Sequence, residues 1–321
     1  KHIIQTAREG KMYKNAYYIH QYSYNQPPLY IDNDMQWLAD CGFNGVSIAI
    51  NEIDLLKNPL GIDRLFTSAK KHDLKVHLVP SRWGGIVAGT PGIQSYFCMK
   101  NPKDTILDKD GTPIRSGLWG TMASVHSPNT YNFFCETFDS IYSNWHFDGI
   151  IWDEPKCFNI MDYHPLAQKK RPINSGIEWD REQFALFFDR IGAYIRTKFN
   201  NVKLAMFLYG DIEDEIFNCC CKITNLDDLG IDGSPYLPNR NTDKRKKTLI
   251  ENANRFRDKA LNSGKNSLIL IENFNMTKDE DKMMDLYLPT IIGYNIDHVL
   301  AYYYGRNNED PDGNMQIIAR H

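Results

Sequence analysis

The feature that most constrains the fold is a regular alternation of short apolar runs with longer amphipathic segments along all 321 residues. Nearly continuous apolar runs are typical of strands buried on both faces, and the segments between them have helical periodicity. A helix-like segment follows each run, the last one being short. Eight such pairs predict a single (β/α)8 barrel over residues 1–321. The runs are residues 16–20, 45–50, 75–80, 149–152, 204–209, 228–232, 267–271 and 298–303.

The segments between the runs predict helices and one long connection. Residues 82–125, after the third run, contain several glycines, and we expect them to fold over the barrel mouth. A doubly wound open sheet is the competing fold, but residues 20–24 lack the Gly-rich turn that usually follows its first strand. The barrel is therefore favoured. The predicted helices are residues 34–40, 62–72, 128–145, 179–199, 244–262 and 278–292, with a short one after the fifth run.

Charge and motifs exclude several classes of function. The 37 basic and 40 acidic residues give a net charge of −3, which argues against nucleic acid as a partner. No apolar run approaches the roughly 20 residues needed for a membrane span. Nucleotide-binding glycine motifs, the serine-hydrolase elbow and the His-x-His of metal-dependent amidohydrolases are missing. We therefore expect no metal and no organic cofactor.

The seven cysteines form an odd set without zinc-like spacing. We expect them to be free, partly buried thiols, a usage that favours a reducing compartment. The chain opens at Lys1 without a methionine, and we expect that any signal peptide or preceding domain has been removed. These two observations leave the compartment open.

Barrel enzymes carry their active sites at the carboxyl ends of the strands, which directs attention to the residues that follow each apolar run. The fourth run ends in Asp153-Glu154-Pro155, and Glu272 follows the seventh run, across the barrel mouth. Each acid of the first pair is expected to raise the pKa of the other. Neighbouring side chains of a regular strand point in opposite directions, so we expect only one acid of this pair to face the pocket fully.

Opposed carboxylates are what glycoside hydrolysis requires, because one group donates a proton and the other stays ionised. A separation of about 5–5.5 Å between them would indicate retention of configuration, and about 6.5–9.5 Å inversion. Aromatic walls suit the apolar faces of sugar rings. The candidates for such walls are Trp83, Trp119, Tyr209, Tyr236 and Tyr304.

The segment Trp152-Asp153-Glu154-Pro155 resembles the Asn-Glu-Pro motif of the retaining clan A glycosidases, the "4/7" barrels. The resemblance covers the barrel as an architecture and about four residues as a motif, with Asp153 where that family has Asn. It implies that Glu154 is the acid/base at strand four and Glu272 the nucleophile at strand seven. It also implies a retaining, two-step mechanism.

Two other interpretations remain open. The α-galactosidase-like barrels of clan D take an Asp nucleophile from strand four and an Asp acid/base from about strand six, which would be Asp153 and Asp232 here. The 4/7 assignment is favoured over this one. A barrel that binds carbohydrate without catalysis is the alternative from another class, and paired acids at strands four and seven argue against it.

The expected partner is a carbohydrate substrate, with Asp153 supporting Glu154 or contacting a hydroxyl group. His20 is more often a hydrogen-bonded core histidine than a catalytic group, and in a glycosidase we expect it to bind a sugar hydroxyl. Arg82 and Arg306 suit either substrate binding or neutralisation of the acidic mouth. The sequence does not indicate the sugar, its linkage or the oligomeric state. The predicted substrate-binding residues are His20, Asn51, Arg82, Trp83, Tyr209, Asp232, Tyr236 and Tyr304.

Overall fold

A computed structural model describes residues 12–18, 27–89, 92–236, 249–302 and 307–321. Eight parallel strands pair in sequence order, and β8 pairs with β1, so that the sheet closes into a barrel. This confirms the predicted (β/α)8 fold, and each strand lies within a few residues of an apolar run of the sequence. The strands are β1 Tyr13–Tyr18, β2 Gly45–Asn51, β3 Lys75–Ser81, β4 Gly149–Asp153, β5 Lys203–Leu208, β6 Asp228–Gly233, β7 Asn266–Glu272 and β8 His298–Tyr302.

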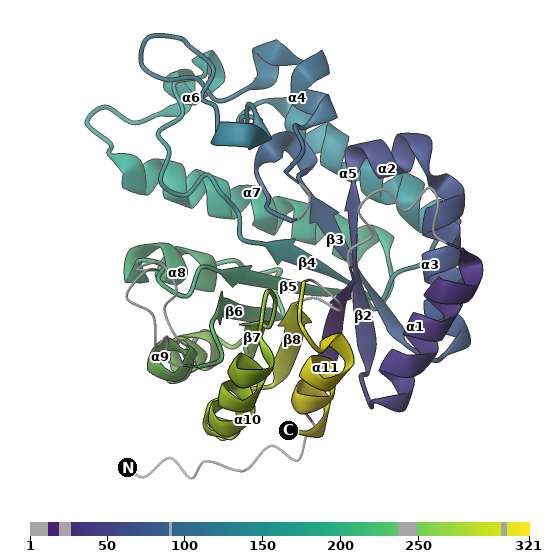
Figure 1. Cartoon of the computed structure of the whole chain (residues 1–321). Helices are drawn as coiled ribbons and strands as arrows, with labels where there is room; N and C mark the ends of the chain where they lie inside the picture. Colours follow the sequence, from purple (N-terminus) through teal and green to yellow (C-terminus); the bar gives the residue numbers. More distant parts are fainter. Residues whose placement is uncertain (1–11, 19–26, 90–91, 237–248, 303–306) are drawn as a thin grey trace.

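Helices surround the barrel, and further short helices lie in the connections above its carboxyl ends (Figure 1). Residues 82–127, between β3 and α5, contain α4 and three short 3-10 turns, and together with α6 they rise above one side of the mouth (Figure 1). None of the described helices is both long and apolar enough to cross a bilayer. The helices are α1 Pro28–Asp40, α2 Glu52–Lys57, α3 Pro59–Lys71, α4 Tyr96–Lys100, α5 Pro128–Asn144, α6 Pro165–Lys170, α7 Ile177–Lys198, α8 Asp214–Cys221, α9 Leu249–Asn262, α10 Lys278–Ile292 and α11 Pro311–Arg320.

The strands are apolar on both faces because each face is buried against a different part of the core. Outward side chains pack under the helices, where Trp152 of β4 meets Phe188 of α7 at a ring-centroid distance of 4.9 Å. Each buried aromatic side chain of this kind contributes about 1.5–3 kcal/mol of transfer free energy. Inward side chains form a separate core inside the barrel: Tyr17, Ala49, Val79, Ile151, Ala205, Phe207, Leu268, Leu270 and Leu300.

Polar side chains fill the amino-terminal end of the barrel. The Tyr13 hydroxyl lies 3.0 Å from Nε2 of His77, and Nδ1 of His298 lies 2.9 Å from a carboxylate oxygen of Asp228. Burial lowers the pKa of His77 to about 3, so this imidazole is neutral at physiological pH. The polar floor and the apolar layer above it separate the lower end of the barrel from the mouth, where the acids predicted for catalysis lie.

Candidate active site

A cavity of about 380 Å³ opens at the carboxyl ends of the strands, where the fold places barrel active sites. Its walls combine acids, bases and aromatic rings. The charged side chains that line it are Arg82, Asp153, Glu154, Lys156, Asp232 and Glu272. The aromatic ones are Trp119, Phe207, Tyr209, Phe274 and Tyr302.

Asp153 ends β4 and points into the barrel, where only 4% of the residue is exposed. The Tyr17 hydroxyl, from β1 across the barrel, donates a hydrogen bond of 2.7 Å to its Oδ2. Burial, and after it the charge of Glu154, raises the pKa of Asp153 to about 7. The hydrogen bond from Tyr17 opposes this rise because it stabilises the ionised form. Asp153 therefore gains and loses its proton near neutral pH.

Glu154 follows with a backbone φ of 34°, in the left-handed region that non-glycine residues rarely adopt. This turn breaks the alternation of the strand, so Glu154 lines the same cavity as Asp153. The expectation that only one acid of the pair faces the pocket is therefore wrong. The Lys156 ammonium donates to Oε2 of Glu154 at 2.5 Å and also to the Tyr209 hydroxyl. Lys156 was not predicted, and only its position two residues after the acid could have indicated it.

Asp232 and Glu272 also line the cavity, from the ends of β6 and β7. Asp232 is 6% exposed, and its Oδ1 accepts a hydrogen bond of 2.9 Å from the Gly210 amide. Burial raises the pKa of Asp232 well above its usual value, and the neighbouring Glu154 and Glu272 carboxylates add to the rise. Asp232 thus interacts with both acids that the 4/7 assignment selects.

Arg82 and Trp119 form the wall on the β3 side. Arg82 also has a left-handed φ, of 61°, and its guanidinium carbon lies 4.1 Å from the centroid of the Trp119 ring. Backbone residues with strained φ values often lie at active sites, where the surrounding structure holds them. Here the amide of Ala88 donates to the Asp153 carbonyl at 2.7 Å, and that of Lys156 to the Ile86 carbonyl at 2.8 Å. The segments after β3 and β4 therefore hold each other in place.

Several predicted site residues lie elsewhere. The left-handed turn at Arg82 sends Trp83 into the core, where it is 0% exposed and donates to the Ile50 carbonyl at 2.9 Å. Asn51 caps α2, because its side chain accepts the Ile53 and Asp54 amides. Neither residue lines the cavity, which corrects the substrate-binding role predicted for both.

Tyr236, also predicted to bind substrate, is outside the cavity lining, and its hydroxyl donates to Glu280 of α10 at 2.9 Å. His20, Tyr304 and Arg306 lie outside the described residues. Tyr209 and Asp232 line the cavity together with Arg82, Glu154 and Glu272, as expected.

The loop wall beside the cavity is fixed by buried carboxylates that the site itself does not use. Glu52, next to Asn51, accepts the Gly84 amide at 2.9 Å, the Ser95 hydroxyl at 2.7 Å and the Phe97 amide at 2.6 Å. It is 8% exposed and acts as an internal anchor for the segment after β3.

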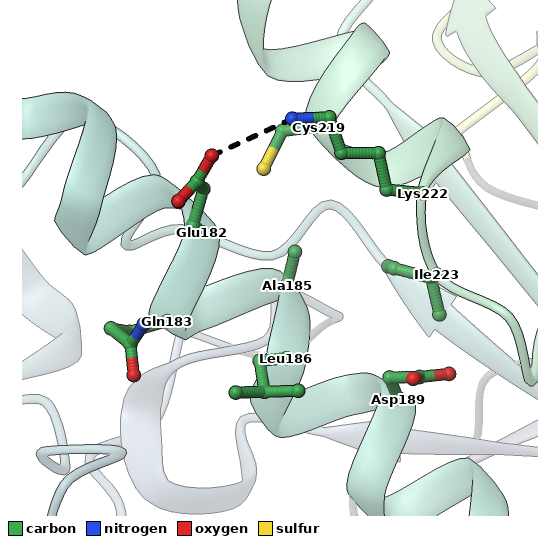
Figure 2. Close-up of a pocket in the computed structure, with 8 residues that line it drawn as sticks. All are labelled: Glu182, Gln183, Ala185, Leu186, Asp189, Cys219, Lys222 and Ile223. Carbon is green, nitrogen blue, oxygen red and sulfur yellow. Dashed lines mark hydrogen bonds and ion pairs between the residues drawn. The ribbon is translucent and has the colours of Figure 1, made fainter.

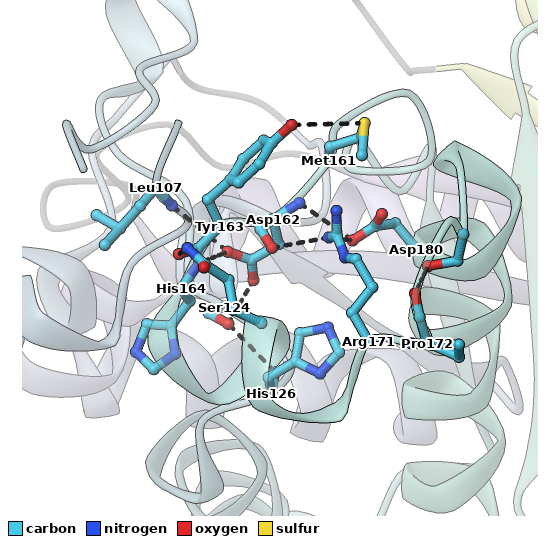
Figure 3. A network of polar contacts seen from close by, with 12 residues as sticks. Leu107, Ser124, His126, Met161, Asp162, Tyr163, His164, Arg171, Pro172 and Asp180 are labelled. Carbon is cyan, nitrogen blue, oxygen red and sulfur yellow. Dashed lines mark hydrogen bonds and ion pairs between the residues drawn. The ribbon is translucent and has the colours of Figure 1, made fainter. Parts of the chain in front are cut away.

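A second buried network joins that segment to the segment after β4 (Figure 3). Asp162 accepts the Ser124 hydroxyl at 2.5 Å and the His164 amide at 2.8 Å. Its own amide donates to Asp180, which also pairs with Arg171 at 2.6 Å. These bonds hold the segments after β3 and β4 in fixed positions on that side of the mouth.

A groove of about 260 Å³ lies between α7 and α8, away from the barrel mouth (Figure 2). The Lys222 ammonium lies 3.5 Å from Glu182 across this groove, over a floor that includes Ala185 and Ile223. It does not bring acids from different strand ends together, so the mouth cavity is the candidate active site. Within the described ranges, no three His, Cys, Asp or Glu side chains are arranged to hold a metal ion, and the described cysteines are free thiols.

No family model matches this sequence, and no curated protein is detectably similar to it. Solved structures with the same architecture include the catalytic domain of a β-amylase from Paenibacillus polymyxa, with a TM-score of 0.62, 10% identity and coverage of 96% of this chain and 97% of that one. An endo-1,4-β-mannanase from Rhizomucor miehei has a TM-score of 0.62 and 12% identity, with coverage of 98% of this chain and 96% of the mannanase. A β-galactosidase from Rahnella sp. R3 has a TM-score of 0.66 and 12% identity. The match covers 98% of this chain and 56% of the β-galactosidase. At these identities the likeness establishes a fold shared with glycoside hydrolases.

Proposed function

We propose that this chain is a glycosidase that cleaves an oligo- or polysaccharide in the mouth cavity. The observation that carries the proposal is the convergence of Asp153, Glu154, Asp232 and Glu272, from the ends of three strands, on one cavity of about 380 Å³. A site that only binds sugar has no use for several partly desolvated carboxyl groups, which cost stability. The β-amylase, mannanase and β-galactosidase that share the fold support the same class of reaction.

In the proposed reaction, Glu154 protonates the leaving glycosidic oxygen while the Glu272 carboxylate attacks the anomeric carbon. Glu154 then takes a proton from water, whose oxygen displaces Glu272 and releases the sugar with its configuration retained. Trp119, Tyr209 and Tyr302 offer flat apolar surfaces for sugar rings. Asp153 supports the geometry of Glu154 or contacts a hydroxyl group.

The clan D assignment, with Asp153 as nucleophile and Asp232 as acid, is less compatible with the electrostatics. A nucleophile must be ionised, and burial holds the pKa of Asp153 at about 7. Glu272, the nucleophile of the 4/7 assignment, is in contrast only partly buried. We therefore retain Glu154 and Glu272 as the reacting pair.

The test is hydrolysis of a panel of aryl glycosides by the wild type, Glu154→Gln and Glu272→Gln. Loss of the nucleophile should abolish activity on every substrate. Loss of the acid should cost roughly 10²–10⁴-fold with poor leaving groups and much less with dinitrophenyl glycosides, which leave without a proton. Glu182→Gln is the matched control, since this acid pairs with Lys222 in the groove between α7 and α8 and has a 57% exposed side chain.

Two results would overturn the proposal. A wild type that binds oligosaccharides but hydrolyses none of the panel would make the chain a binding protein. If Asp153→Asn and Asp232→Asn showed the nucleophile and acid signatures instead, the clan D pair would replace Glu154 and Glu272. NMR detection of the first anomer released would test retention directly.

A further inference from the structure

Lys156 raises a question about the proton that the proposed mechanism needs. Its ammonium lies 2.5 Å from Oε2 of Glu154, and only 14% of the Lys156 side chain is exposed. A buried cation at this distance favours the ionised form of its carboxylate partner. Because the ammonium occupies Oε2 of Glu154, a neighbouring group in the cavity is a candidate for holding the proton that the mechanism needs.

Asp232 is placed to hold that proton. It is 6% exposed at the end of β6 and hydrogen-bonds to Glu154, and its Oδ1 accepts the Gly210 amide. The Glu272 carboxylate also acts on it. Two neighbouring buried carboxyls cannot both stay ionised at low cost, because their charges repel and neither is well solvated. The other titratable or charged groups lining this cavity are Arg82, Asp153, Lys156, Tyr209, Glu272 and Tyr302.

We propose that Asp232 and Glu154 share one proton, which resides on Asp232 in the resting site while Lys156 neutralises Glu154, and that this is the proton given to the leaving group. The inference rests on the proposed glycosidase function. As the glycosidic C–O bond breaks, its electron pair goes to the leaving oxygen, and the shared proton passes from Asp232 to Glu154 and from Glu154 to that oxygen. Glu272 meanwhile bonds to the anomeric carbon. In the second step Glu154 removes a proton from water, and the water oxygen bonds to the anomeric carbon as the bond to Glu272 breaks. The proton taken from water restores the protonated state of the Asp232–Glu154 pair.

Infrared spectroscopy tests the position of this proton without any turnover. The wild type is prepared with carboxyl-¹³C aspartate or carboxyl-¹³C glutamate and measured about one unit above the pKa of Asp153, where that group is roughly nine-tenths ionised. A carboxylic-acid C=O band that shifts with the aspartate label is expected. This band should be lost in Asp232→Asn and retained in Asp153→Asn, the control for the other buried aspartate of the cavity.

The variant Lys156→Met tests whether the Lys156 ammonium keeps the shared proton on Asp232. Without the ammonium, the proton should move to Glu154, so that the band follows the glutamate label. In activity assays Asp232→Asn should move the alkaline limb of kcat/KM to lower pH by about one unit or more, because its amide donates to the Glu154 carboxylate and supplies no proton.

The outcomes separate this inference from the function on which it rests. Absence of the aspartate band in the wild type, or its survival in Asp232→Asn, would overturn the shared proton while leaving the glycosidase proposal intact. A band that stays on aspartate in Lys156→Met would overturn the role of Lys156. An inactive wild type with the expected bands would overturn the catalytic use of the proton. The isotope labelling of the wild type needs no variant. It therefore shows whether an aspartate holds the proton even if a substitution fails to fold.

Discussion

Replacing Tyr17 by Phe should destabilise the protein more at alkaline than at acidic pH. Tyr17 is 0% exposed, and its hydroxyl donates 2.7 Å to Asp153, a carboxyl whose pKa burial raises to about 7. The bond stabilises the ionised form of Asp153 more than the protonated form. Removing the hydroxyl therefore costs most at a pH where Asp153 is charged.

The magnitude follows from the two states of this bond. A hydrogen bond to a charged group contributes about 1.5–3 kcal/mol, against about 0.5–1.5 kcal/mol for a neutral one. At about pH 5 Asp153 is protonated in the folded wild type and the folded variant, so only the neutral bond is lost. At about pH 9 the charged bond is lost, and the extra cost of about 1 kcal/mol equals a rise of about one unit in the pKa of Asp153.

The direction of the pH dependence of stability follows from the raised pKa of Asp153. The pKa of Asp153 is higher in the folded protein than in the unfolded chain, so this group's contribution to stability is complete below about pH 4 and falls until about pH 7. In Tyr17→Phe the fall should continue to about pH 8.

Urea unfolding at the two pH values is the assay, with Tyr194→Phe as the matched control. The Tyr194 hydroxyl also donates 2.7 Å to an aspartate, Asp139, but this pair joins α7 to α5 at the surface, so its loss should be nearly independent of pH. An equal loss at both pH values for Tyr17→Phe would refute the reasoning. So would a pH-dependent loss that persists when Asp153 is replaced by Asn.

Three further substitutions have defined outcomes. Glu52→Gln should lower the free energy of unfolding by about 2–4 kcal/mol in thermal or urea unfolding, because a buried acceptor of the Ser95 hydroxyl and two amides is weakened. Unchanged stability would show that this anchor is unimportant. Trp119→Ala should raise KM for glycosides several-fold with little change in kcat, since it removes a sugar-facing wall and the ring over Arg82; a loss confined to kcat would contradict this. Asp153→Asn should stabilise the protein by up to about 4 kcal/mol above neutral pH and little at about pH 4, measured by unfolding across the pH range, because the amide has no charge to desolvate. Stabilisation that is independent of pH would count against the buried charge.

The barrel could be predicted from the sequence because its strands are buried on both faces. Runs such as residues 149–152 therefore read as continuous apolar segments, and the observed β4, Gly149–Asp153, ends one residue later. The long connection after β3 was predicted only as a loop. Its short helices are held by distant buried acids such as Glu52 and Asp162, and such contacts leave no periodicity in the local sequence.

The strand-end rule located Glu154, Asp232 and Glu272 at the mouth, but it could not resolve side-chain direction. A left-handed φ at Arg82 sends that residue to the cavity and Trp83 into the core. A similar turn brings Glu154 to the same side as Asp153. No residue type at these positions indicates such a turn, since glycine or asparagine would be its usual sign.

The hydrogen bond between Tyr17 and Asp153 links the first strand to the fourth, and Asp232 of the sixth strand interacts with Glu154 and with Glu272 of the seventh. Neither half of the chain, taken alone, contains this complete set of groups. If the proposed function holds, a truncated or half-synthesised polypeptide would thus be inactive, even if it had already formed several strand-and-helix units. Only chains whose barrel has closed would contribute to the measured turnover. The recovery of activity during refolding would therefore follow the last stage of barrel closure.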